Sequence, residues 1–120
     1  MSGLSDTARS LACLAAWRTR RQLTAHQAEV LVHVHAASAA TAADVCRVMG
    51  ITTASMARIV AQLVAGGWVV RLRDRDDARR LILQPSKQLV LALAELEREL
   101  GEERSGPAEL GTLLTYDRQV

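Results

Sequence analysis

Charged side chains crowd one short stretch near the middle of the chain. Five arginines lie within residues 71–80, and three aspartates separate them: Arg71, Arg73, Arg75, Arg79 and Arg80, with Asp74, Asp76 and Asp77. A guanidinium can bind a phosphate, or the edge of a guanine, through two parallel hydrogen bonds. A plain basic patch needs no aspartates, so we expect at least one Asp–Arg pair to shape this turn. The alternative is a solvated charged turn without a partner.

The residues on both sides of this turn have strand-like patterns. Residues 68–73 and 80–84 are rich in Val, Ile and Leu, and together they predict a β-hairpin, or wing, over residues 68–84. An arginine near a hairpin tip can enter the narrow, electronegative minor groove of DNA. The candidate DNA-binding residues of the wing are Arg73, Arg75 and Arg79.

A helix is expected immediately before the hairpin. Apolar residues recur at helical spacing over residues 53–65, and Gly66–Gly67 ends the pattern. A helix fits the major groove with its N-terminal residues against base edges, so residues 52–66 are the expected recognition helix. Its candidate DNA contacts are Thr53, Ala54, Ser55 and Arg58. Arg58 could read a guanine or hold a phosphate, and the sequence leaves both open.

The remaining elements are expected to be helices. Residues 4–20 have helical periodicity, and Thr24 with Gln27 forms a capping-box signal for the next helix. Residues 36–41 are expected to be a connector, followed by a short helix that starts after Thr41 and ends at Gly50. After Pro85–Ser86, an amphipathic helix is expected over residues 87–103, a break at Gly106–Pro107 and a last short helix over residues 108–116. The glutamates of residues 95–103 are expected on a solvated face.

Together these elements predict a mainly α protein with a small β-hairpin wing (α+β), a winged helix-turn-helix. We expect a single domain over residues 1–120, in which residues 23–86 form the DNA-binding core. Residues 1–22 and 87–120 are the expected flanking, dimerisation helices.

The composition is that of a globular domain. The chain has 120 residues, 49% of them hydrophobic, and no Phe. Its small aliphatic side chains bury little area each, which favours a dimer. The charge is uneven: residues 1–80 carry a net charge of +5 and residues 81–120 a net charge of −3. Two cysteines are too few for a disulfide scaffold, and no secretion signal or membrane span is expected, so the expected location is cytoplasmic.

Other chemically active residues favour ordinary interpretations. His26, His33, His35 and Cys46 lack ligand spacing for a metal site, so neither a metal nor a cofactor is expected. Cys13 or Cys46 as a redox switch stays open, although a small buried thiol is the ordinary outcome. Trp17, near Arg18, Arg20 and Arg21, could line an effector pocket but more often would simply pack. No catalytic motif is found, so no enzyme activity is expected.

A set of short motifs stands at fixed spacing along the middle of the chain: Leu23–Thr24, Gly50–Ile51, the segment from Ser55 to Val60, Gly67 and the wing signature Asp77–Ala78–Arg79. With these motifs, residues 23–88 resemble the DNA-binding core of the MarR family of transcriptional regulators. In the family this Asp forms an ion pair that orients the wing, and this Arg lies against DNA. The resemblance implies these roles for Asp77 and Arg79. It also implies a homodimer and a ligand cleft. Three departures are Pro85–Ser86 for the usual Leu-Thr, Leu89 for a Gly, and short flanking helices.

Two functions follow as hypotheses. The first is a homodimeric transcriptional repressor that binds double-stranded DNA sequence-specifically and is released by an effector such as a small molecule. The second is a winged-helix protein-interaction module, or co-regulator, that has lost DNA binding. The modest net charge of +2 motivates the second hypothesis.

Overall fold

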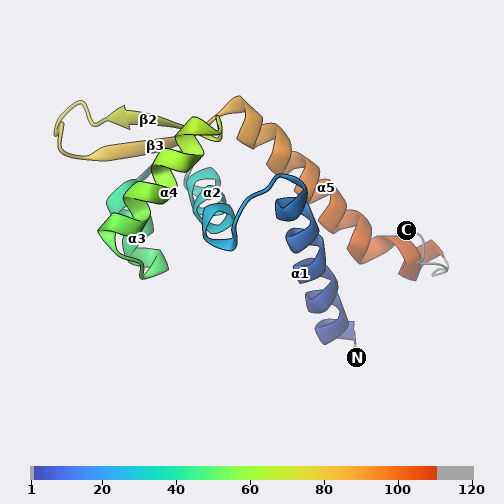
Figure 1. Ribbon diagram of the computed structural model, residues 1–120. Helices are drawn as coiled ribbons and strands as arrows, with labels where there is room; N and C mark the ends of the chain where they lie inside the picture. The colour runs from blue at the N-terminus through green and yellow to red at the C-terminus, as the bar shows by residue number, and fades with distance from the viewer. Residues whose placement is uncertain (1, 111–120) are drawn as a thin grey trace. The chain divides into compact units, whose positions relative to one another are not determined.

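The computed structural model describes residues 2–110, and their side chains from residue 5 to residue 101. Over these residues the chain forms five helices and three short strands (Figure 1). The elements are α1 (Ser2–Arg20), α2 (Ala25–Ala37), β1 (Ala40–Thr41), α3 (Ala42–Met49), α4 (Thr53–Ala65), β2 (Val69–Arg73), β3 (Leu81–Pro85) and α5 (Lys87–Leu110). The predicted mainly α fold with a small β wing is confirmed.

Local signals place the helix ends. Thr24 accepts a hydrogen bond from Gln27 N, and the Gln27 side chain accepts one from Thr24 N, which completes the predicted capping box. Thr41 caps α3 by accepting from Asp44 N, and α3 ends at Gly50, whose φ of 68° is left-handed. Glycine takes that conformation without the steric penalty of a Cβ, so the chain turns sharply between α3 and α4.

The described residues divide into two compact units, residues 24–91 and residues 2–23 with 92–110. The first unit holds α2, α3, α4 and the sheet around a core that includes Leu31, Val34, Val60, Leu63 and Leu83. In the second unit, α1 lies beside the later part of α5 and runs antiparallel to it, with Trp17 buried between them (Figure 1).

The sheet has the strand order β1-β3-β2, and both pairings are antiparallel. In the β2–β3 register Arg71 lies opposite Leu83 and Leu72 lies opposite Ile82. Successive side chains of a strand point to opposite faces, so Arg71 and Arg73 share the face of the buried Leu83. Val70 and Leu72 lie on the other face of the sheet.

Two expectations for the connections are wrong. Residues 36–41 are not simply a connector: α2 continues to Ala37, and Ala40–Thr41 pairs with β3. A strand of two residues forms because it pairs with a distant strand, and it is too short to show an alternating pattern in the sequence.

The expected break at Gly106–Pro107 is also absent, because α5 continues to Leu110. A proline crowds the Cβ of the residue before it, and Gly106 has no Cβ. Most of the expected helix over residues 108–116 lies outside the described residues.

Within the described part of the chain, no single helix is long and apolar enough to cross a membrane. Only α3 and α4 taken together pass such a test of length and composition, and they are bent by 120° at the turn between them.

Candidate nucleic-acid interface

The turn between α3 and α4 sets the direction of α4. The two helices bend by 120°, within the range of a helix-turn-helix pair. Thr52 caps α4 by accepting a hydrogen bond from Ser55 N at 3.0 Å. The inner face of α4 is buried through Met56, Ile59, Val60 and Leu63, as the apolar spacing predicted. Its outer face is therefore fixed toward solvent.

The predicted α4 residues lie at or near this outer face. Thr53, Ala54 and Arg58 are exposed, and Ser55 is half-buried. The first turn of a helix also has backbone N–H groups without intrahelical partners, which favour a phosphate or another anion. The face can therefore offer hydroxyls, methyl groups, one guanidinium and the positive end of the helix dipole.

The wing loop is held by its own aspartates. Asp74 N donates to Arg80 O at 3.0 Å, and Arg80 N donates to Asp77 O at 2.9 Å, so the loop closes on itself. The Asp74 carboxylate accepts from Asp76 N at 2.8 Å, and the Asp77 carboxylate accepts from Arg79 N at 3.1 Å. These short local bonds give a charged loop a defined backbone shape.

Two ion pairs connect these aspartates to arginines. The Arg79 Nε donates to Asp77 Oδ1 at 3.1 Å, and its Nη2 to Asp77 Oδ2 at 3.3 Å. The Arg80 Nη1 lies 3.2 Å from Asp74 Oδ2. The expectation of at least one Asp–Arg pair is met twice, although the sequence reading did not single out Asp74 with Arg80. The sequence feature that could have predicted this second pair is its position: Asp74 and Arg80 stand at the two ends of a seven-residue loop and therefore face each other at its base.

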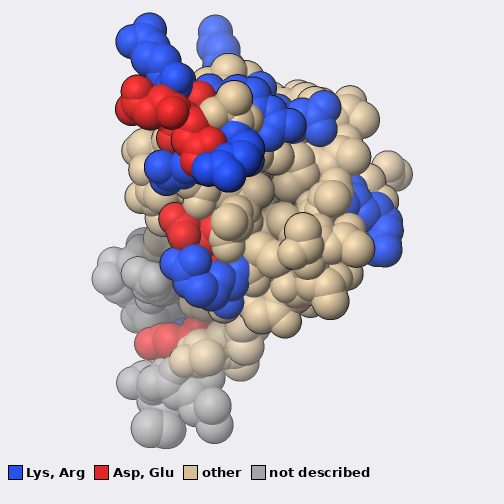
Figure 2. Space-filling model, turned by 90° about the vertical axis from the view of Figure 1, so that its left-hand side faces the viewer, with Lys and Arg blue, Asp and Glu red and all other residues tan. Residues whose placement is uncertain are grey.

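Four other arginines of this unit keep their charge uncompensated. Within the described residues no carboxylate pairs with Arg58, Arg71, Arg73 or Arg75. In Figure 2 basic side chains crowd the upper part of this face with acidic groups set among them, and smaller basic groups lie below and at the right edge. Excess positive charge here attracts a polyanion.

A cleft of about 570 Å³ lies between α3, α4 and the wing. Thr53, Met56 and Ala57 of α4 line one side, and Arg79 and Arg80 line another. The α4 N-terminus and the base of the wing therefore border one hollow. Cys46 also lines it, and its thiol donates to Ile51 O at 3.0 Å, which occupies the thiol hydrogen in a structural contact.

The Asp77 carboxylate gives this wing a pH dependence that can be measured. Side-chain and then backbone hydrogen bonds from Arg79 hold the pKa of Asp77 below its ordinary value of 3.8. Because the pKa is lowered on folding, the contact is complete above the ordinary value and is lost as pH falls through the lowered pKa. We expect the Asp77 carboxyl and the Arg79 backbone amide to titrate together in NMR spectra, with a midpoint below 3.8. Asp77→Asn should remove the titration of that amide. A midpoint at or above the ordinary value would contradict the contact.

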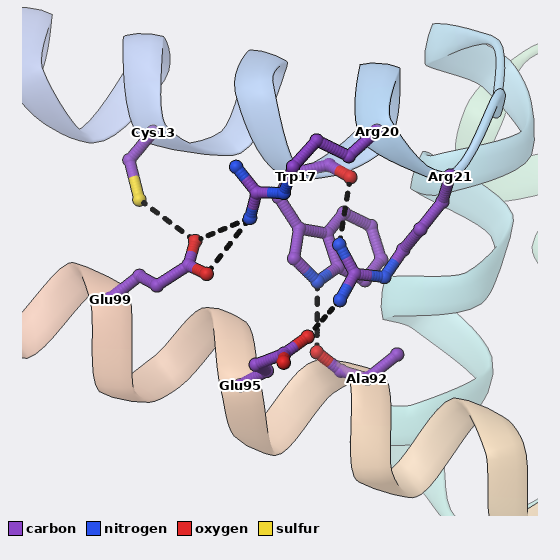
Figure 3. A network of polar contacts seen from close by, with 7 residues as sticks. All are labelled: Cys13, Trp17, Arg20, Arg21, Ala92, Glu95 and Glu99. Atoms are coloured by element: carbon purple, nitrogen blue, oxygen red, sulfur yellow. Dashed lines mark hydrogen bonds and ion pairs between the residues drawn. The ribbon is translucent and has the colours of Figure 1, made fainter.

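In the unit that contains α1, arginines of α1 and of the turn after it form ion pairs with glutamates of α5. Trp17 is fully buried, and its Nε1 donates to Ala92 O at 2.8 Å (Figure 3). The Arg21 guanidinium lies 4.8 Å from the Trp17 ring centroid and pairs with Glu95. Arg20 binds Glu99 with two hydrogen bonds, of 2.8 and 3.0 Å. Of the two interpretations of Trp17, packing is therefore the one the contacts favour.

These pairs correct the expectation that the glutamates of residues 95–103 are simply solvated. Glu95 and Glu99 are half-buried and face α1. The Cys13 thiol lies 3.9 Å from Glu99 Oε1.

The histidines make few contacts. His33 lies 3.8 Å from Glu29, one turn earlier on α2, and the buried His35 Nδ1 has no hydrogen-bond partner among the described residues. No group of three or more metal-ligating side chains occurs in the part of the chain that the structure describes.

A helix pair with a sharp turn, followed by an arginine-rich hairpin, defines a winged helix-turn-helix protein. The sequence model of the MarR family matches residues 21–80, half of the chain. The chain belongs to the MarR family of winged-helix transcriptional regulators. No curated protein sequence gives a significant match.

Solved structures share the fold. A mutant of MarR from E. coli, complexed with operator DNA, matches with a TM-score of 0.68 and 22% identity over 94% of this chain and 79% of that chain. A mutant of MepR from S. aureus, bound to an oligodeoxyribonucleotide, matches with a TM-score of 0.68 and 17% identity over 80% and 73% of the chains. NadR in complex with 4-hydroxyphenylacetate has a TM-score of 0.70 and 19% identity over 89% and 76%.

Proposed function

We propose that this regulator is a repressor that binds double-stranded DNA sequence-specifically. In this proposal, residues 52–66 enter the major groove and the wing, residues 68–84, reaches toward the minor groove. The observation that carries the proposal is the arrangement of α4 and the wing around one cleft, with arginines that lack carboxylate partners on both.

Each DNA contact in the proposal has its own chemistry. Thr53, Ala54, Ser55 and Arg58 would face base edges, because they lie in the first two turns of α4. The exposed Arg73, Arg75 and Arg79 would contact phosphates or the minor groove. Asp77 would not touch DNA but would orient the wing, and its hydrogen bonds to Arg79 support that role.

We further propose a homodimer, with residues 23–86 as the DNA-binding core and residues 1–22 and 87–120 as flanking segments. Support comes from α1, which leaves an uncharged face in solvent: Ala8, Leu11, Ala12 and Ala15, with Leu11 62% exposed. A dimer would place two α4 helices about one turn of DNA apart, on an inverted repeat. This role requires the compartment that holds the DNA, which agrees with the cytoplasmic location expected from the sequence.

The proposal also includes a small-molecule effector. Its support is that NadR, which shares this fold, is found in complex with 4-hydroxyphenylacetate.

The protein-interaction alternative has one observation in its favour. Val70 is 45% exposed and Leu72 is 40% exposed, on the wing face away from the core. An apolar sheet face is a common feature of protein-binding surfaces.

One experiment separates the two functions. Duplexes bound by the protein are selected from a random pool, and the mass of the free protein in solution is measured. Recovery of an inverted repeat, with a dimer mass, supports the repressor. Absence of duplex binding at micromolar protein and low salt would reject it in favour of the interaction module.

A further inference from the structure

The exposed face of α4 has very few groups that can tell one base pair from another. Its exposed side chains after the first residue are four alanines, Arg58 and Gln62; the alanines are Ala54, Ala57, Ala61 and Ala65. An alanine presents only a methyl group. Hydrogen-bond discrimination along this face therefore depends on Arg58, Gln62 and the hydroxyls near the helix start.

Gln62 is already engaged within the protein. Its Oε1 accepts a hydrogen bond of 2.8 Å from the Gln27 Nε2. The Oε1 of the same Gln27 side chain accepts from Thr24 N at 2.8 Å, as part of the capping box of α2. Gln62 is thus tied to the first turn of α2, and presenting both its Oε1 and its Nε2 to the N7 and N6 of an adenine would compete with that contact.

The hydroxyls near the helix start discriminate poorly. Thr53 is exposed and Ser55 is half-buried. A hydroxyl is both donor and acceptor, so it can hydrogen-bond to any base edge that it reaches. These groups can add affinity without selecting a base.

Arg58 differs from all of them. It is exposed, and no carboxylate pairs with it among residues 5–101. Ala54 lies four residues before it and Ala61 three residues after it, hence on the same helix face. Short side chains on both sides allow the helix backbone to approach the groove floor, where a long guanidinium meets base edges. Its forked donors match the O6 and N7 acceptors of guanine.

We propose that Arg58 is the specificity-determining residue of α4 and that it reads one guanine in each half-site. The flanking alanine methyl groups then favour thymines beside that guanine, because apolar contact with the thymine methyl is the one preference that alanine can express. This inference rests on the proposed function, since it assumes that α4 faces the major groove.

The test uses duplexes selected by the wild-type protein from a random pool. Each guanine of the half-site is replaced in turn by 7-deazaguanine, which lacks N7 but pairs normally. We expect one replacement to weaken wild-type binding about 10-fold. Arg58→Ala removes the guanidinium with all its donors, so it should bind the unmodified duplex about 10-fold more weakly and be indifferent to the replacement. Deoxyuridine in place of a contacted thymine should weaken wild-type binding about fourfold for each methyl removed.

Gln62→Ala is the matched control on the same helix face. It should retain the full sensitivity to 7-deazaguanine and bind within about twofold of wild type, because its side chain is committed to Gln27. The proposal is overturned if no 7-deazaguanine weakens wild-type binding. It is also overturned if Arg58→Ala keeps that sensitivity, or if Gln62→Ala loses it. If the wild-type protein selects no duplex at all, the proposed function itself fails.

Discussion

Trp17→Ala should lower the free energy of unfolding by about 3–5 kcal/mol, the usual cost of removing a fully buried aromatic side chain. Trp17 has 0% of its surface exposed. The substitution removes its packing, the Nε1 hydrogen bond to Ala92 O, and the ring beneath the Arg21 guanidinium. Arg21 would then lose part of what holds it beside Glu95. A loss of this size is a large fraction of the total stability of a small domain.

Urea unfolding followed by helical circular dichroism measures this loss. Val48→Ala on α3 is the control, since Val48 is 64% exposed and its truncation should change stability by no more than about 0.5 kcal/mol. Trp17→Phe keeps most of the buried ring and removes only the Nε1 donor, so its cost should fall between the two. If Trp17→Ala and Val48→Ala unfolded at the same urea concentration, the burial of Trp17 would be wrong.

The parts of the fold that the sequence predicted are those with local causes. A threonine before an apolar run, with Gln three residues later, marked the start of α2 because both capping bonds form within one turn. Gly50 marked the end of α3 because glycine adopts the left-handed backbone conformation at a lower energetic cost than other residues. The buried face of α4 followed from its helical spacing.

The parts that the sequence did not predict depend on distant residues. Strand β1 exists because Ala40 and Thr41 pair with β3, some forty residues later in the chain. Glu95 and Glu99 looked like solvated charges, but they pair with Arg21 and Arg20 of α1. Charge alone cannot distinguish a solvated glutamate from a paired one when the partner lies more than 70 residues away.

The candidate DNA-binding site was predicted from the sequence only in part. The charge pattern of the wing predicted an Asp–Arg pair, and the pair of Asp77 with Arg79 forms within three residues. Which arginines stay without a carboxylate depends on the loop geometry and became visible only in the structure.

Arg73→Ala combined with Arg75→Ala should weaken duplex binding by on the order of 100-fold at low salt, because each lost charge-assisted contact contributes about 1.4 kcal/mol or more. Neither guanidinium pairs with a carboxylate in the described residues, so both are available to DNA. The slope of log K against log salt should also become shallower by about one unit for each phosphate contact removed. Fluorescence anisotropy of a labelled duplex over a series of salt concentrations measures both effects. Arg9→Ala combined with Arg98→Ala removes the same charge from α1 and α5 and should leave the slope nearly unchanged.

Arg79→Ala alone should weaken binding less than Arg75→Ala alone. The Arg79 side chain is 91% exposed, but its guanidinium is already hydrogen-bonded to Asp77, so part of its charge is neutralised before DNA arrives. Asp77→Asn removes that neutralising charge and also the acceptor that shapes the loop. If Arg79 acts mainly as a cation, this change should tighten binding at low salt; if the loop geometry dominates, binding should weaken. The resemblance assigns Asp77 an orienting role, and we therefore expect weaker binding despite the gain in positive charge. Wild-type affinity in both Arg75→Ala and Arg79→Ala would show that the wing does not contact DNA.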